Sequence, residues 1–123
     1  MSGDRQVTFL EVGLRLHGEF RRSLEPIRVT PLQAGVMLYL HLCANARLTE
    51  AAAALRVQSP TLADVVQDLV RKRWVTKRRS LEDRRAVCLQ LSRRGEAMTR
   101  TIEHRISRME THAETLRQVQ LAV

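Results

Sequence analysis

The sequence predicts a mainly α-helical fold (α+β) in which short helices, a basic two-stranded hairpin and a long final helix follow one another. From 59 onward, apolar residues at 62, 65, 66, 69 and 70 form one buried stripe on a helix. Residues 74–78 and 86–91 are typical of two strands joined by a charged turn, and Val87, Leu89 and Leu91 share one face of the second strand. A helix followed by such a hairpin is the order of a winged helix-turn-helix.

Composition limits the classes of protein to consider. The 123 residues suit a single domain, and 44% apolar with 28% charged residues indicate a globular chain. The formal net charge is +8, and all but two of the 21 basic residues are arginine. Because arginine bonds phosphate and guanine in a bidentate way, this charge indicates an anionic partner, either nucleic acid or an acidic membrane surface. No apolar run approaches the ~20 residues of a membrane span and no signal peptide begins the chain, so we expect a cytoplasmic protein without a membrane partner.

The N-terminal third predicts two helices. Apolar residues at helical spacing predict a first helix over 6–24, which Pro26 ends. Thr30 and Pro31 then have the residue types of an N-cap and a first helical position. The segment that follows, up to Ala46, is apolar almost all round, so its helix should lie in the middle of the structure.

Two further helices complete a helix-turn-helix. Thr49 is the expected cap of a helix over 49–55, and residues 56–58 form a short turn. Ser59 is the expected cap of the next helix, with Pro60 at its first position.

The last helix is predicted to begin at the Ser92 cap and to continue nearly to the end. A helix over 92–120 would be ~43 Å long at ~1.5 Å per residue, which is more than a small core can cover. We therefore expect a homodimer within a single 1–123 domain, with dimerisation helices 6–24 and 92–123 and a DNA-binding lobe 30–91. The expected interface residues are Phe9, Leu16, Met98, Ile102, Ile106, Met109 and Leu116.

The helix that starts at Ser59 carries the candidate base contacts. At 100° per residue Pro60, Asp64, Gln67 and Arg71 point away from the core, with Thr61 and Asp68 on one flank. The DNA contacts expected from this helix are Ser59, Pro60, Thr61, Asp64, Gln67 and Arg71. Gln67 suits adenine, Asp64 suits the cytosine amino group, and Arg71 suits guanine or phosphate. The alternative is an ordinary solvated helix face, and two carboxylates, Asp64 and Asp68, favour it. Asp68 has basic neighbours within one turn that can neutralise it.

The hairpin is the stronger indication of nucleic-acid binding. Residues 71–85 hold eight basic residues against only Glu82 and Asp83. Such charge also protects an exposed strand edge from aggregation, but eight cations exceed that need. The expected DNA contacts here are Lys77, Arg79, Arg84 and Arg85, with the arginines at the tip suited to the narrow minor groove.

Several pieces together resemble the MarR family of bacterial transcriptional regulators. They are Thr30-Pro31-Leu32-Gln33, residues 48–55, Ser59-Pro60-Thr61-Leu62, residues 69–75 and the most specific piece, residues 81–95. The resemblance implies a winged-helix homodimer that binds pseudo-palindromic operators on double-stranded DNA and is released by a small ligand or by oxidation. It also implies that residues 61–71 form the recognition helix, and that Asp83 orients Arg85 for the minor groove.

The chain departs from the family pattern in three places. Arg73 occupies the position of a helix-ending glycine, where a left-handed residue would cost ~1–2 kcal/mol. Asp64 replaces a basic or small residue, which changes the expected operator preference. The family also continues into a further C-terminal helix beyond the position of Val123, so we expect a short member whose first and last helices make the dimer.

Other functions are disfavoured. Cys43 is expected to be buried and inert in the apolar helix, while Cys88 lies near arginines. The histidines show no metal spacing, and no nucleotide-binding or catalytic motif is present, so neither a cofactor nor an enzyme is expected. The sequence thus predicts a DNA-binding regulator, a repressor relieved by a small-molecule effector. The alternative is a winged-helix interaction module for an acidic protein.

Overall fold

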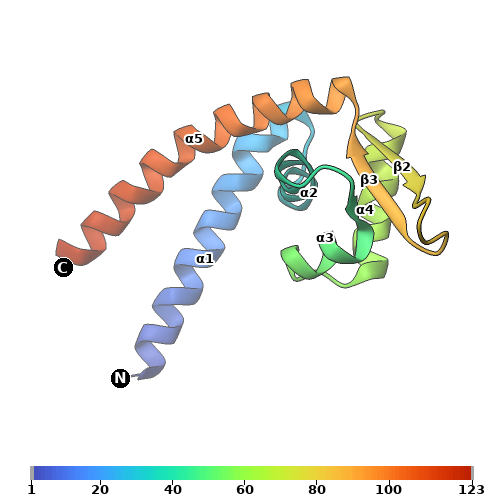
Figure 1. Ribbon diagram of the computed structural model, residues 1–123. Coiled ribbons are helices and arrows are strands. Elements are labelled where there is room, and N and C mark those ends of the chain that lie inside the picture. Colours follow the sequence, from blue (N-terminus) through green and yellow to red (C-terminus); the bar gives the residue numbers. More distant parts are fainter. Residues whose placement is uncertain (1, 123) are drawn as a thin grey trace. The chain divides into compact units, whose positions relative to one another are not determined.

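The computed structural model describes the backbone of residues 2–122 and the side chains of residues 8–109 (Figure 1). Leu32–Glu103 form one compact unit, and the described residues before and after this range form a second. The first unit carries the small helices and the sheet, while the second holds α1 (Ser2–Leu24) and the C-terminal part of α5 (Arg93–Ala122). Mostly helical structure with a small antiparallel sheet confirms the predicted fold class.

Helix α1 ends where the sequence predicts and begins earlier, at Ser2 rather than at residue 6. A 3-10 turn, η1 (Glu25–Ile27), follows directly and contains Pro26. Arg28 then adopts a left-handed conformation with φ 57°, and its backbone N–H donates to the Glu25 carbonyl. This turn separates α1 from the next helix.

Helix α2 (Pro31–Leu42) is the centre of the Leu32–Glu103 unit, as its all-round apolar character predicts. Its buried residues are Gln33, Ala34, Val36, Met37 and Leu40. The expected continuation to Ala46 is wrong, because Asn45 turns the chain with φ 58° and Ala46–Arg47 become strand β1. Two residues are too few to show the alternation of a strand, so the sequence gives no sign of β1.

Both helices of the helix-turn-helix form, but their caps differ from the prediction. Helix α3 spans Leu48–Leu55, so Thr49 lies inside it and the extended Arg47 precedes it. Helix α4 spans Ser59–Arg71, and the extended Gln58 is its N-cap, accepting a hydrogen bond from the Leu62 N–H. The expected caps Thr49 and Ser59 are therefore wrong by one or two positions, and no side chain caps either helix.

The hairpin follows the predicted pattern. Strands β2 (Val75–Arg79) and β3 (Val87–Leu91) pair in antiparallel register, with Val75 opposite Leu91 and Arg79 opposite Val87. Strand β1 adds to the other side of β3, giving the order β1-β3-β2. Leu89 and Leu91 are buried, and so are Leu62, Val66 and Leu69 of α4. The apolar faces of helix and hairpin therefore form one core.

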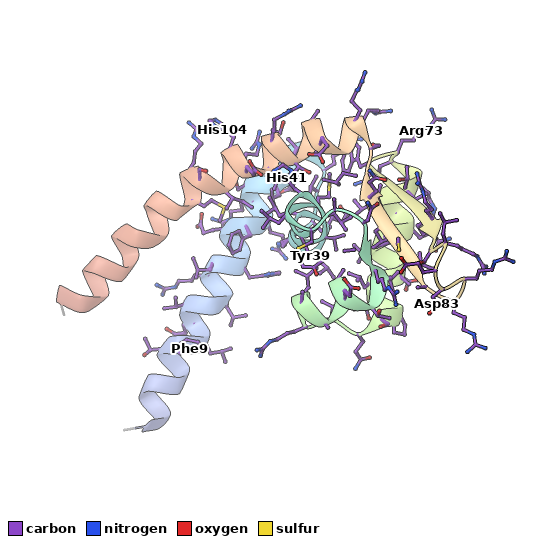
Figure 2. All side chains as sticks on the ribbon, viewed as in Figure 1. Phe9, Tyr39, His41, Arg73, Asp83 and His104 are labelled. Carbon is purple, nitrogen blue, oxygen red and sulfur yellow. The ribbon has the colours of Figure 1, made fainter. Side chains whose placement is uncertain are left out.

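A joint between α4, β2 and α5 fixes the hairpin at its base. Arg73 has φ 64°, and the N–H groups of Arg73 and Trp74 bond the carbonyls of Val70 and Leu69, which is a Schellman end to α4. The Ser92 hydroxyl donates to the Arg73 carbonyl (2.6 Å) and accepts from the Gly95 N–H (3.0 Å), which confirms Ser92 as the α5 cap. Figure 2 shows Arg73 and Asp83 at opposite ends of the hairpin. Arg73 thus adopts a left-handed backbone conformation that favours glycine.

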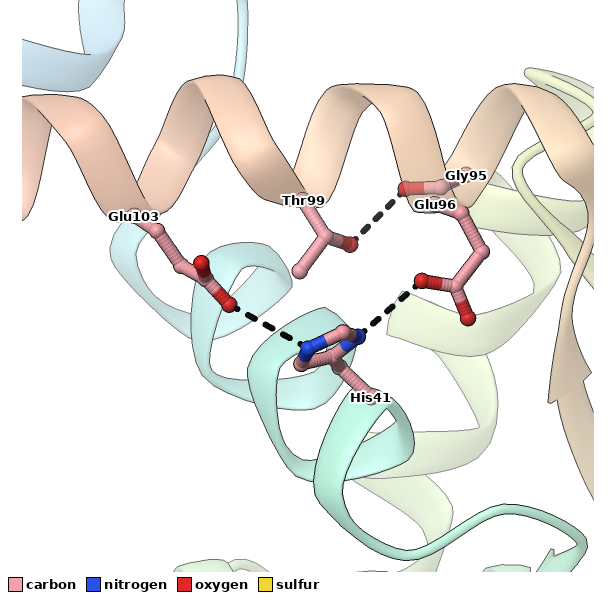
Figure 3. Close-up of polar contacts among 5 residues, drawn as sticks. All are labelled: His41, Gly95, Glu96, Thr99 and Glu103. Atoms are coloured by element: carbon pink, nitrogen blue, oxygen red, sulfur yellow. Dashed lines mark hydrogen bonds and ion pairs between the residues drawn. The ribbon is translucent and has the colours of Figure 1, made fainter.

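A second tie joins α2 to α5 within the same unit. His41 lies between two carboxylates of α5, with Nδ1 3.0 Å from Glu96 Oε2 and Nε2 3.5 Å from Glu103 Oε1 (Figure 3). Between them, the fully buried Thr99 donates its hydroxyl proton to the Gly95 carbonyl at 2.8 Å. The three pairing side chains are partly exposed, so their contribution to stability is modest, ~0–1 kcal/mol per pair. The contact sets the position of α5 on α2.

The expected burial of Cys43 is wrong. Helix α2 ends at Leu42, so Cys43 falls in the following turn and is an exposed free thiol. Burial and the neighbouring Cys43 thiol, with which it shares a side-chain hydrogen bond, raise the pKa of the Tyr39 phenol. Cys88 is a half-buried free thiol on β3.

Gly95→Ala should destabilise the fold by ~1–3 kcal/mol, because a Cβ at this position would overlap the Trp74 carbonyl oxygen. Thermal or urea unfolding measures the effect. The matched control is Gly18→Ala on α1, where a Cβ meets no atom within 4 Å and should stabilise the helix by up to ~1 kcal/mol. Equal stability changes in the two variants would contradict the packing described at the joint.

Candidate nucleic-acid interface

Helix α4 presents a mixed polar face to solvent. The exposed residues on it include Thr61, Asp64, Gln67, Asp68 and Arg71, while the opposite stripe is buried or half-buried. Ser59 and Pro60 in the first turn are also exposed. The amphipathic spacing therefore separates buried from exposed side chains as the sequence predicts. An amide, two carboxylates and a guanidinium are exposed to solvent.

The charged groups at the end of α4 have partners within the protein. Arg71 Nη1 donates to Asp68 Oδ1 at 2.8 Å, which is the local neutralisation expected for this aspartate. The Lys72 ammonium lies 4.8 Å from the centre of the Trp74 ring and 3.4 Å from Gln33 Oε1. Lys72 is thus directed toward its own fold, so the free positive charge of this region lies on the hairpin.

The tip of the hairpin is held by its own hydrogen bonds. The Ser80 hydroxyl accepts from the N–H groups of Glu82 (3.2 Å) and Asp83 (3.3 Å). The Asp83 carboxylate in turn accepts from the Arg85 N–H at 3.0 Å. Two backbone bonds, Ala86 N–H to Asp83 O and Ser80 N–H to Ala86 O, close the turn. The tip is therefore a defined turn rather than an open loop.

Asp83 acts on the backbone of Arg85, not on its guanidinium. The hydrogen bond from the Arg85 N–H fixes the chain direction at this residue, and the side chain remains exposed. Arg79 supports the same turn from the strand, with Nη1 3.4 Å from the Arg84 carbonyl oxygen. The sequence singled out Asp83 and Arg79 but missed Ser80, although serine at the start of a tight turn is a recognisable signal.

Helix α4 and the hairpin are joined at the C-terminal end of the helix. The chain leaves this end of α4 into β2, and the tip of the hairpin lies away from the junction (Figure 1). The predicted contact residues that are exposed are Ser59, Pro60, Thr61, Asp64 and Gln67 on α4 and Lys77, Arg79, Arg84 and Arg85 on the hairpin. Arg71 is exposed at the other end of α4.

The residues expected at a dimer interface have mixed environments. Phe9 is 83% exposed on α1, and Leu16, Met98, Ile106 and Met109 are half-buried. Ile102 is completely buried within its own chain, so it belongs to the core and not to a surface for a partner. Leu116 lies outside the residues whose side chains are described. Leu10 and Leu14, which the sequence did not single out, are 62% and 63% exposed.

Within the residues that the structure describes, no group of three or more His, Cys, Asp or Glu side chains has the arrangement of a metal site. Nor does that part of the chain contain a helix of the length and apolar character that would cross a membrane.

Comparison with known families identifies the chain. The sequence pattern of the family described as "Transcriptional regulator SarA/Rot" matches residues 20–102, which is more than half of the chain. The protein belongs to this SarA/Rot family of transcriptional regulators. The match spans the helix-turn-helix, the hairpin and the start of α5, and it confirms a regulator rather than an enzyme. No curated protein sequence matches the chain.

Solved structures show the same fold at low sequence identity. Apo MarR from Escherichia coli is 21% identical, with a TM-score of 0.81 over 92% of this chain and 82% of that chain. The Staphylococcus aureus MepR–DNA complex is 18% identical, with a TM-score of 0.83 over 91% and 83%. CouR bound to a 23-mer DNA duplex is 22% identical, with a TM-score of 0.78 over 94% and 90%. This SarA/Rot family member therefore has a MarR-like winged-helix fold, as the resemblance implied.

Proposed function

We propose that this regulator is a homodimer that binds pseudo-palindromic operators on double-stranded DNA and acts in the cytoplasm as a repressor. The observation that carries the proposal is the combination, in one compact unit, of a helix-turn-helix whose second helix exposes a polar face and a hairpin whose arginine-bearing tip is held by its own hydrogen bonds. The net charge of +8 suits a polyanionic partner. Support also comes from the similar MepR and CouR structures, both of which contain DNA.

The two elements would contact different parts of the duplex. The N-terminal half of α4 enters the major groove, where Gln67 pairs with adenine and Asp64 accepts from cytosine. The hairpin tip lies over the adjacent minor groove, where the exposed guanidinium of Arg85 or Arg84 meets the most negative potential. Ser80 and Asp83 hold the turn in advance, so little conformational freedom is lost on binding.

The proposed DNA binding is tested by titrating labelled duplexes, first genomic fragments and then the selected operator, over a range of salt concentrations. Affinity should fall steeply with salt, with ~0.9 added to the log–log slope for each neutralised phosphate. Half-sites should be separated by ~34 Å, one helical turn. Absence of duplex binding at low salt would refute the function, and binding to an acidic protein that duplex DNA cannot displace would favour the interaction module.

Arg85→Ala should weaken binding to all duplexes and lower the salt slope, because it removes a minor-groove cation. Gln67→Ala should instead relax the preference for one base at one position, at a cost of ~1–3 kcal/mol on the preferred site. Both side chains are exposed, so the unfolding midpoint should not change. Operator selection and salt titration on the two variants measure the difference. Wild-type behaviour of both variants would show that the contacts are wrongly assigned.

Homodimerisation is proposed from the apolar surface of α1. Phe9, Leu10 and Leu14 are large apolar side chains of one helix, and each is more than 60% exposed. The charged chain offers no other reason to display them, and a second copy would cover them. Half-buried Leu16 continues this surface on α1, while Ile106 and Met109 supply apolar side chains from α5.

Leu14→Glu should shift the protein from dimer toward monomer, because the carboxylate would be buried in the proposed contact. Sedimentation measures the mass, which should be about twice the 14.1 kDa of one chain in the wild type. The control is Arg15→Glu, which adds the same carboxylate at the next exposed position. A monomeric wild-type protein would rule out this arrangement, and with it the two-half-site operator.

Relief by a small ligand is proposed to act through a cavity of about 380 Å³ between α1 and α5. Its lining residues are Leu16, Glu19, Arg22, Ser23, Arg105, Arg108 and Met109. Arg105 donates to the Ser23 carbonyl at 2.8 Å and so closes one wall. Three guanidinium groups against the one carboxylate of Glu19, together with the apolar side chains of Leu16 and Met109, favour an organic anion with a hydrophobic body.

Benzoate, as a simple aromatic carboxylate, should weaken operator binding by the wild type at millimolar concentration. Arg108→Ala should remove the response while leaving ligand-free DNA binding within about twofold, because Arg108 lines the cavity and belongs to neither α4 nor the hairpin. Arg100→Ala, an exposed arginine outside the lining, is the control. An equal benzoate response in all three proteins would show that the cavity is not the effector site.

A further inference from the structure

The helix-turn-helix itself contains very little positive charge. From the start of α3 to the end of α4, the basic residues Arg56 and Arg71 stand against three acidic residues, Glu50, Asp64 and Asp68. Glu50 lies 3.8 Å from Arg47, and Asp68 lies 2.8 Å from Arg71. Asp64 has no ion pair among the described side chains. The part of the fold that would approach DNA most closely is therefore net negative, which opposes its approach to phosphates.

Arg56 stands in the turn between α3 and α4, in a backbone conformation that favours glycine. Its φ is 55° and its ψ 44°, in the left-handed region that costs an L residue ~1–2 kcal/mol. The N–H groups of Arg56 and Val57 bond the carbonyls of Ala53 (3.2 Å) and Ala52 (2.9 Å), so the turn is a Schellman end to α3. The backbone there is fixed, and it holds the Arg56 side chain three residues before α4 begins.

The Arg56 side chain makes no contribution to the fold that would explain its presence. It is exposed, and the guanidinium has no hydrogen bond or ion pair with any described side chain or backbone group. A glycine would form the same turn with less strain. Together with the charge balance above, this leaves a role outside the chain as the physical reason for an arginine.

We propose that Arg56 is a phosphate-contacting residue of the DNA interface. It supplies a cation close to the start of α4, at the opposite end from Arg71, and it anchors the recognition helix against the repulsion from Asp64. The proposal rests on the DNA binding proposed above and adds a contact that the sequence pattern did not indicate. Phosphate carries no base information, so Arg56 fixes the position of the helix and not its base preference.

The same structure contains a matched control at the other end of α4. Arg73 is also a left-handed arginine in a Schellman turn, with φ 64°, and it is also exposed. It lies at the base of the hairpin, whereas Asp83 lies at the tip (Figure 2). Arg56 and Arg73 thus share conformation and charge but differ in their place along the recognition helix.

The experiment replaces each arginine by asparagine, which tolerates the left-handed conformation and has no charge. Arg56→Asn should weaken operator binding by about tenfold or more at moderate salt, and should lower the log–log salt slope by ~0.9 per copy, ~1.8 per dimer. The base preference in an operator selection should stay the same. Arg73→Asn should match the wild type in affinity and slope, and the unfolding midpoints of both variants should match or exceed that of the wild type.

The outcomes separate this inference from the proposed function. If the wild-type protein binds no duplex, the function fails and the inference fails with it. If the wild type binds and Arg56→Asn binds equally well with the same slope, only the Arg56 contact is refuted. An equal loss in Arg73→Asn would also refute it, because the effect would then be a general change in charge. Partial recovery of affinity in Arg56→Lys would support a phosphate contact, since lysine restores the charge.

Discussion

The hydroxyl of Ser92 makes the contact on which the arrangement of the Leu32–Glu103 unit depends. It donates to the carbonyl of the residue that ends α4 and accepts from an N–H of the first turn of α5, so one side chain joins two helix ends. Gly95 lets the Trp74 carbonyl lie directly against α5, and the Ser92 N–H bonds that carbonyl at 2.9 Å. The hairpin leaves the helices at this point, and its direction follows from these few bonds. The winged helix of this protein thus consists of a helix pair and a hairpin that are joined at the junction of α4, β2 and α5.

The positive charge is divided unevenly between the two elements that are proposed to contact DNA, the hairpin and the helix-turn-helix. The hairpin holds five exposed cations (Lys77, Arg78, Arg79, Arg84 and Arg85), whereas the helix-turn-helix holds two, Arg56 and Arg71, and has more carboxylates than guanidinium groups. Under the proposed function, the hairpin is therefore the main electrostatic attachment to DNA, and α4 contributes polar groups that distinguish bases. In such a division, affinity and selectivity can change separately through substitutions on different elements. The exposed apolar side chains of α1 belong to neither role and suit protein–protein contact.

Much of this fold could be predicted from periodicity and turn chemistry, because these signals are local. The stripe on α4, the strands and the Ser92 cap follow from short-range patterns, whereas the left-handed Arg73 is implied by the resemblance to the MarR family. The errors occur where tertiary contacts decide. Strand β1 forms because β3 offers an edge to Ala46, and the same pairing ends α2 early and exposes Cys43. The spacing of Ile102 in the sequence predicts a residue of the dimer interface, but its side chain is buried in the core of its own chain.

The candidate site likewise has features that the sequence predicts and features that only the folded structure shows. Exposure of the α4 face and the tip arginines follows from amphipathic spacing, but the role of Ser80 depends on bonds that only the folded turn shows. His41 meets Glu96 and Glu103 across more than fifty residues of chain, so no local pattern reveals the contact. Arg56 is unremarkable in the sequence, and its left-handed backbone and lack of a partner appear only in the structure.

The ion pair between Asp68 and Arg71 has a consequence for how binding responds to ionic strength. Before its guanidinium can bond a base or a phosphate, Arg71 has to leave a carboxylate 2.8 Å away, and one anionic partner is exchanged for another. The pair brings no net charge to the duplex, so its contact displaces few counterions and is little affected by added salt. Salt that loosens the arginine-rich hairpin therefore leaves this contact comparatively intact, and discrimination among sites can persist where overall occupancy falls.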